Sequence, residues 1–170
     1  SATGRRTLER LLRAGKWPPA IYVATQPDRS RLADYTRKNV DERRQRNEER
    51  VRGRRLWKKG SAAWLRTATQ LEPHVRAIRA RGGEVVFVRM PMGGALERAS
   101  DRSFPRDRYW DRFAQATSAR TVHYVDHPAM RGLVLPDDSH LDMRDAPRFT
   151  SGLVDALSAL SVLPAGDLVR

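Results

Sequence analysis

"EVVFVRM", residues 84–90, is the strongest strand signal in the chain and decides its fold class. A continuous run of β-branched and aromatic residues is typical of a strand that is buried on both faces. The "PMGG" that follows at 91–94 ends this run, because proline and glycine interrupt a strand. We therefore predict a central strand over residues 84–90.

Shorter apolar runs predict two more strands, "AIYVAT" at 20–25 and "TVHYVD" at 121–126. Helical spacing of apolar residues predicts helices over 61–83, where Pro73 should kink or split the helix, and over 104–119 and 146–160. The polar segment 97–103 is expected to be a connector. This alternation predicts an α/β domain over residues 1–170, with a parallel sheet flanked by helices on both faces.

Residues 31–60 are dense in arginine, lysine and glutamate, and we predict a charged helical insertion there. The formal net charge of the chain is +13. Such a charge suits phosphates or anionic surfaces as partners, and GC-rich coding also produces arginine-rich sequences. A non-catalytic basic module is therefore one hypothesis, with Arg43, Arg44, Arg50 and Arg54 contacting a polyanion or a partner protein. Nucleic acid is the less favoured polyanion, because acidic residues alternate with the basic ones.

The sequence also excludes several kinds of site. It contains no cysteine, which rules out disulfides, thiolate metal sites and cysteine nucleophiles. No apolar run is long enough to span a bilayer. No cofactor is expected. A metal site is not expected either, since nothing fixes three of the histidines and aspartates of segment 123–140 on one point.

"LPDDSHLDMRD", residues 135–145, places two aspartates and a histidine on a turn before the last predicted helix. Asp137 and His140 have the spacing D-x-x-H, which allows a carboxylate to orient an imidazole that acts as a base. The alternative is structural, with Asp137 and Asp138 forming the turn and His140 packing under the helix. In either case we expect Asp142 or Asp145 to cap the last helix. The loop 126–140 is expected at the carboxyl edge of the sheet, where sites form in such folds.

The stretch "LPDDSHLDMRDAPRFTSGLVDAL", residues 135–157, resembles the fifth block of the SGNH (GDSL-like) hydrolases, in which a D-x-x-H turn precedes the C-terminal helix. "EVVFVRMP" resembles the fourth strand of that fold, "TVHYVD" the fifth, and "AIYVATQPDRSRLADY" the third strand and its exit. The resemblance implies a flavodoxin-like fold and an ester hydrolase or O-acyltransferase. Asp137 would be the acid and His140 the base, and the substrate an acylated carbohydrate or another ester. The resemblance is closest to SGNH-like envelope proteins of bacteria, which implies a location in the cell envelope or periplasm.

The sequence also departs from the family pattern. The Gly-Asp-Ser block that carries the nucleophile has no counterpart, and neither has the Gly-x-Asn-Asp block of the oxyanion hole. At the corresponding strand exit, Gln26, Arg29 and Ser30 are the candidate oxyanion or substrate contacts. The expectation is that the chain forms the C-terminal portion of an SGNH-like protein. Its serine would then come from a missing N-terminal segment or another chain. A truncated pseudoenzyme is the alternative.

Overall fold

The computed structural model describes residues 9, 13, 22–53 and 60–163 of the chain. Its strands are β1 (Val23–Thr25), β2 (Arg31–Ala33), β3 (Val86–Arg89) and β4 (Arg120–His123). Its α-helices are α2 (Asp41–Gly53), α3 (Gly60–Ala68), α4 (Glu72–Arg79), α5 (Gly94–Ser103), α6 (Trp110–Ala116) and α7 (Ala146–Ala159). Short 3-10 turns cover Tyr35–Arg37, Thr69–Leu71, Arg106–Arg108, Tyr124–Asp126 and Pro128–Met130.

The mixed α/β class is confirmed, and the parallel sheet is a small one. β3 pairs with β4 in parallel, with Val88 opposite Val122 and Arg89 opposite His123. The predicted strand over 84–90 is present as Val86–Arg89. Within the described residues, β4 is its only neighbour, so the broader sheet expected around 84–90 is not seen there.

The expectation for residues 20–25 is wrong in its pairing. The described part of that segment, β1, pairs antiparallel with β2 and not with the parallel sheet. The turn between the two strands closes through hydrogen bonds from Gln26 N–H to Ser30 O (2.8 Å) and from Arg29 N–H to Gln26 O (2.9 Å). A tight hairpin therefore replaces the predicted strand exit, because the chain reverses immediately and pairs with its own continuation.

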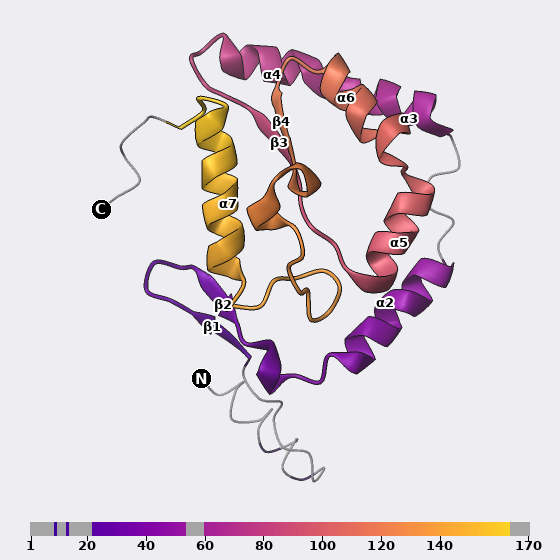
Figure 1. Cartoon of the computed structure of the whole chain (residues 1–170), viewed down its shortest axis with the longest axis vertical. Coiled ribbons are helices and arrows are strands. Elements are labelled where there is room, and N and C mark those ends of the chain that lie inside the picture. Colours follow the sequence, from indigo (N-terminus) through magenta and orange to yellow (C-terminus); the bar gives the residue numbers. More distant parts are fainter. Residues whose placement is uncertain (1–8, 10–12, 14–21, 54–59, 164–170) are drawn as a thin grey trace.

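Both faces of the β3–β4 pair are covered, which explains the continuous apolar run (Figure 1). On one face, Val86 and Val88 pack against a core formed by Val122, Met130, Phe149 and Ala156, the last two from α7. On the other face, Phe87 meets Phe113 of α6 edge to face, with ring centroids 4.9 Å apart. Because Val86 and Val88 point to one face of the strands and Phe87 to the other, α7 lies on one side and α6 on the other.

Pro73 splits the predicted helix 61–83, as expected. α3 and α4 are separated by the 3-10 turn at Thr69–Leu71, and Pro73 lies in the first turn of α4. A proline has no N–H to donate and is tolerated there. The last helix is also confirmed, as α7 over 146–159.

One other expectation is wrong. The segment 97–103, predicted to be a connector, belongs to helix α5. Its alanine, glutamate and arginine residues are good helix formers, and polar side chains suit the exposed face of a helix. Asp145 is the N-cap residue of α7, in agreement with the prediction that Asp142 or Asp145 caps this helix, but its side chain makes no capping hydrogen bond. The Asp142 carboxylate instead accepts a hydrogen bond from Tyr35 N–H at 2.9 Å, which ties the segment after β2 to the loop before α7.

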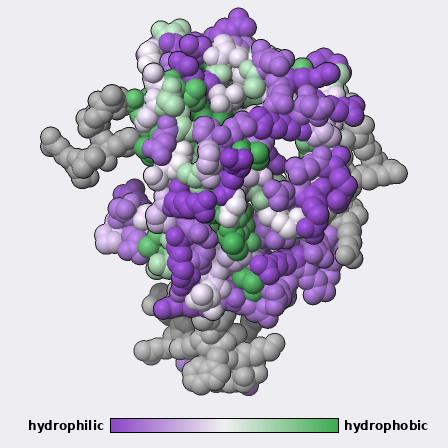
Figure 2. All heavy atoms as spheres, viewed as in Figure 1, coloured by the Kyte–Doolittle hydropathy of each residue, from purple (hydrophilic) through white to green (hydrophobic). Residues whose placement is uncertain are grey.

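Most of the face shown in Figure 2 is hydrophilic, with hydrophobic residues in scattered groups. This agrees with the large excess of arginine and lysine in the sequence. No helix in the described part of the chain is both long and apolar enough to cross a membrane.

Glu72, at the start of α4, ties that helix to the turn before β4. Its Oε2 accepts hydrogen bonds from Ser118 N–H and Thr117 Oγ1, both at 3.1 Å. Hydrogen bonds from Ser118, and then from Thr117, lower the pKa of Glu72 from 4.5 to about 2. Because the folded pKa is depressed, the stability that this carboxylate contributes is present above pH 4.5 and is lost as the pH falls towards 2.

We therefore expect Glu72→Gln to destabilise the protein near neutral pH, and the difference from the parent chain to shrink as the pH falls from about 4.5 to about 2. Urea unfolding at several pH values measures this. Glu84→Gln is the matched control, since it makes the same substitution at an exposed carboxylate, 4.0 Å from Arg79. A pH-independent difference for Glu72→Gln would contradict the expectation.

Candidate functional site

The two neighbouring aspartates of the 135–145 segment point to different partners. Asp138 adopts a left-handed backbone conformation (φ 64°), which aspartate tolerates better than most residues. Its carbonyl accepts a hydrogen bond from Gly93 N–H (3.0 Å), and its Oδ2 accepts one from Ala95 N–H (3.3 Å). Asp138 thus satisfies free N–H groups at the start of α5 and joins this loop to the exit of β3.

Gly94 is the residue that lets this carboxylate approach the helix. Its φ is +52°, and a Cβ at this position would overlap the Asp138 carboxylate. We expect Gly94→Ala to destabilise the protein by roughly 2–4 kcal/mol, combining backbone strain with the displaced turn. Thermal or urea unfolding measures the loss.

Gly132→Ala is the matched control, since Gly132 also has a positive φ (+65°) and an added Cβ would meet nothing within 4 Å. Gly132→Ala therefore measures only the cost of placing a residue with a Cβ at a positive φ, about 1–2 kcal/mol of unfolding free energy. Equal losses in the two variants would mean that the Asp138 contact does not constrain position 94.

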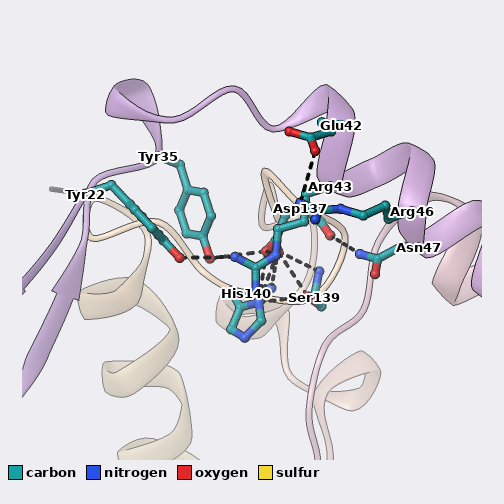
Figure 3. Close-up of polar contacts among 9 residues, drawn as sticks. All are labelled: Tyr22, Tyr35, Glu42, Arg43, Arg46, Asn47, Asp137, Ser139 and His140. Carbon is teal, nitrogen blue, oxygen red and sulfur yellow. Dashed lines mark hydrogen bonds and ion pairs between the residues drawn. The ribbon is translucent and has the colours of Figure 1, made fainter. Parts of the chain in front are cut away.

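Asp137, by contrast, is fully buried and faces His140 (Figure 3). Its Oδ1 accepts hydrogen bonds from the backbone N–H groups of Ser139 (3.1 Å) and His140 (2.9 Å). The Nδ1 atom of His140 lies 3.0 Å from Oδ2 and 3.2 Å from Oδ1 of the same carboxylate. The D-x-x-H spacing therefore closes a turn that holds carboxylate and imidazole in contact.

This geometry selects one tautomer of His140. A carboxylate is an acceptor only, so an Nδ1 atom that faces both of its oxygens must carry the proton. The lone pair then lies on Nε2, the nitrogen available to accept a proton from a reacting group. The His140 side chain is 57% exposed, so it is not packed under the last helix.

The carboxylate of Asp137 also receives donors from residues far away in the sequence. Arg43 Nε, on α2, lies 3.1 Å from Oδ2, and the Tyr35 hydroxyl donates to the same oxygen at 3.3 Å. Asn47, one turn further along α2, donates its side-chain N–H to the Asp137 carbonyl at 2.9 Å. The charged helix thus forms one wall of the site and fixes the turn from outside (Figure 3).

These contacts decide the protonation state of the site. Burial alone would raise the pKa of Asp137, but the hydrogen bond from Ser139 N–H and the attraction of His140 outweigh it, so the pKa is lowered. Asp137 is therefore ionised at neutral pH. Burial and the neighbouring Asp137 charge raise the pKa of Tyr35 to about 12, which keeps its hydroxyl a donor.

A cleft of about 460 Å³ opens beside His140. Met90 and Pro91 line it from the exit of β3, and Ser139 and His140 from the loop that follows β4. Its other wall comes from the β1–β2 hairpin and from Tyr35 and Arg43. The cleft thus lies beyond the carboxyl end of β3, and the end of the loop 126–140 contributes Ser139 and His140 to it.

The candidate oxyanion residues Gln26, Arg29 and Ser30 lie elsewhere. They form the turn of the β1–β2 hairpin and are not among the residues that line the cleft. The reason is the antiparallel pairing of β1, which carries its exit away from His140. The structure does not bring these residues to the Asp137–His140 pair.

The candidate polyanion-binding residues do not form a set of equivalent surface cations. Arg43 is engaged by Asp137, and Arg44 Nη1 lies 3.8 Å from Asp41 on the same helix. Arg50 is exposed, and Arg54 lies outside the described residues. Nothing distinguishes this group as one binding surface, so the basic-module hypothesis gains no support from their arrangement.

Tyr35, Arg43 and Asn47 are the residues of the site whose roles the sequence did not indicate. Asn47 is a buried, uncharged residue in a helix of charged ones, four positions after Arg43. That i,i+4 pair marks one face of α2 and was the available signal. It could not identify Asp137 as the partner, which is 90 residues away from Asn47.

No three His, Asp or Glu side chains in the described ranges are grouped so that they could hold a metal ion. His123, considered above for such a site, is buried, and its Nδ1 accepts a hydrogen bond from Val125 N–H at 3.3 Å. His123 thus stabilises the turn that follows β4.

Comparisons of the chain with protein-family models, with curated proteins and with solved structures find no match.

Proposed function

We propose that this chain carries the acid–base pair of an SGNH-type ester hydrolase or O-acyltransferase. The observation that supports the proposal is the contact between buried Asp137 and Nδ1 of the exposed His140, at the edge of an open cleft. A base that is oriented on one nitrogen and free on the other is what acyl transfer through a serine ester requires.

In the proposed reaction, Nε2 of His140 accepts the proton of a serine hydroxyl while the serine oxygen attacks the ester carbonyl. The tetrahedral intermediate collapses when the imidazolium returns that proton to the departing alcohol, which leaves an acyl-serine. Water or a sugar hydroxyl then attacks this ester with His140 again as base, and the acyl–serine bond breaks as the imidazolium returns the proton to the serine oxygen. Asp137 stabilises the imidazolium in both steps without being protonated itself.

Ser139 is not suited to the role of nucleophile. Its Oγ lies 2.7 Å from Nδ1 of His140 and donates to Asp137 Oδ1 at 3.1 Å. It therefore contacts the nitrogen that faces the carboxylate, whereas the proton-accepting nitrogen is Nε2. Since the sequence holds no Gly-Asp-Ser block, we propose that the serine comes from a polypeptide segment outside this sequence.

The test uses protein purified from the organism that naturally makes it, so that any segment or partner that completes the site is present. A fluorophosphonate probe, which forms a covalent bond with an activated serine and releases fluoride, is added to the purified material. We expect a serine adduct in the parent protein and its loss in His140→Ala and Asp137→Asn.

Asp107→Asn, which changes an exposed carboxylate outside the cleft lining, should label as the parent does. The absence of a serine adduct in the parent protein, or labelling that survives His140→Ala, would overturn the proposal.

A further inference from the structure

The cleft beside His140 is lined by both apolar and cationic side chains. Leu32, Met90, Leu135 and Leu141 give it an apolar lining. Arg31 and Arg43 also line it, and no aspartate or glutamate of the described residues does. A cleft with cationic and apolar walls but no acidic lining favours a ligand that combines an apolar part with a negative charge.

Arg43 retains donors for such a ligand. Its Nε contacts Asp137 (3.1 Å), and its Nη1 donates to the Tyr22 hydroxyl (3.1 Å). A guanidinium has five N–H groups, so these two contacts do not exhaust it. Figure 3 shows the Arg43 guanidinium between Tyr22 and Asp137, and the Asp137 oxygen that Arg43 contacts also faces Nδ1 of His140.

Arg31 is the less constrained of the two cations. It is the first residue of β2, opposite Thr25, and it is exposed. Its side chain forms no hydrogen bond or ion pair with another residue in the described ranges. Lys38 adds positive charge nearby, with its Nζ 4.2 Å from the centre of the Tyr22 ring.

We propose that this cleft binds an oxyanion group, a carboxylate or a phosphate, carried by the substrate next to the ester that His140 acts on. Arg31 would contact the anion directly, and the unused edge of Arg43 would be its second donor. Guanidinium groups match both anions with paired hydrogen bonds. This inference rests on the proposed function for its link to an ester, but the binding itself can be measured separately.

The experiment titrates three probes into the protein at fixed ionic strength, namely glucuronate, glucose 6-phosphate and uncharged methyl glucoside. The NMR signals of the His140 ring report occupancy of the cleft. We expect saturable binding of at least one anion, with methyl glucoside about tenfold weaker or more, as the loss of a charged hydrogen bond implies. The carboxylate and phosphate arms show which anion the cleft prefers.

Arg31→Gln should weaken binding of the preferred anion about tenfold. Arg29→Gln, on the same hairpin, removes the same charge from a residue outside the cleft lining and is the matched control. Equal binding of charged and uncharged probes, no binding of either anion, or equal losses in both variants would overturn the inference. Serine labelling does not enter this readout, so a failure here and a failure of the proposed acyl transfer are distinguishable.

Discussion

Asp137→Ala should lower the free energy of unfolding by roughly 2–4 kcal/mol. The variant removes a carboxylate that is fully buried and that accepts from Ser139, His140, Tyr35 and Arg43. Those donors would be left without a partner in a site that water enters poorly. The loss is smaller than for a fully buried ion pair, because the Arg43 side chain is 30% exposed and can be rehydrated. Urea unfolding at neutral pH measures it.

His140→Ala is the informative comparison. The His140 side chain is 57% exposed, so its removal should lower the free energy of unfolding by less than about 1 kcal/mol. The pair is thus expected to be asymmetric in its effect on stability, with Asp137 contributing more than His140. A loss for His140→Ala as large as that for Asp137→Ala would contradict this assignment.

Asp137→Asn should reduce ester turnover by about 10³–10⁴-fold in the protein isolated from its own host. The amide preserves the shape of the side chain, but it cannot stabilise an imidazolium and it permits the wrong tautomer of His140. Hydrolysis of p-nitrophenyl acetate, measured above the His140→Ala background, gives the rate.

Asp138→Asn tests whether this loss is specific to one of two adjacent carboxylates. Asp138 accepts from Ala95 N–H at the start of α5, and an asparagine oxygen can do the same. Turnover should therefore stay close to that of the parent protein. Similar losses in Asp137→Asn and Asp138→Asn would indicate damage to the turn and not to an acid–base pair.

Local signals in the sequence predicted the elements that depend on local chemistry. The run at 84–90, the proline at 73 and the apolar spacing of 146–160 correspond to β3, the break between α3 and α4, and α7. The contact of Asp137 with His140 belongs to the same class, because a four-residue turn brings them together. The catalytic role of that contact, and the likeness to SGNH hydrolases, stay predictions.

The features that sequence reasoning missed depend on partners that are distant along the chain. Residues 20–25 have a strand-like composition, and nothing in them indicates whether the neighbour is Arg31–Ala33 or the sheet of β3. In the sequence Arg43 resembles the arginines around it. What distinguishes it is its contact with the Asp137 carboxylate, which lies far away along the chain. Aspartate is a residue type that commonly caps helices, but the Asp142 carboxylate accepts a hydrogen bond from Tyr35 N–H, 107 residues away.

The proposed role of His140 as base requires an unprotonated Nε2 that faces the cleft. The ¹⁵N chemical shifts of its two ring nitrogens measure this in the folded protein at a pH where the ring is neutral. We predict a protonated Nδ1 and an unprotonated Nε2 in the parent chain, and a mixture of tautomers in Asp137→Ala. A protonated Nε2 in the parent chain, or shifts that Asp137→Ala leaves unchanged, would contradict the account.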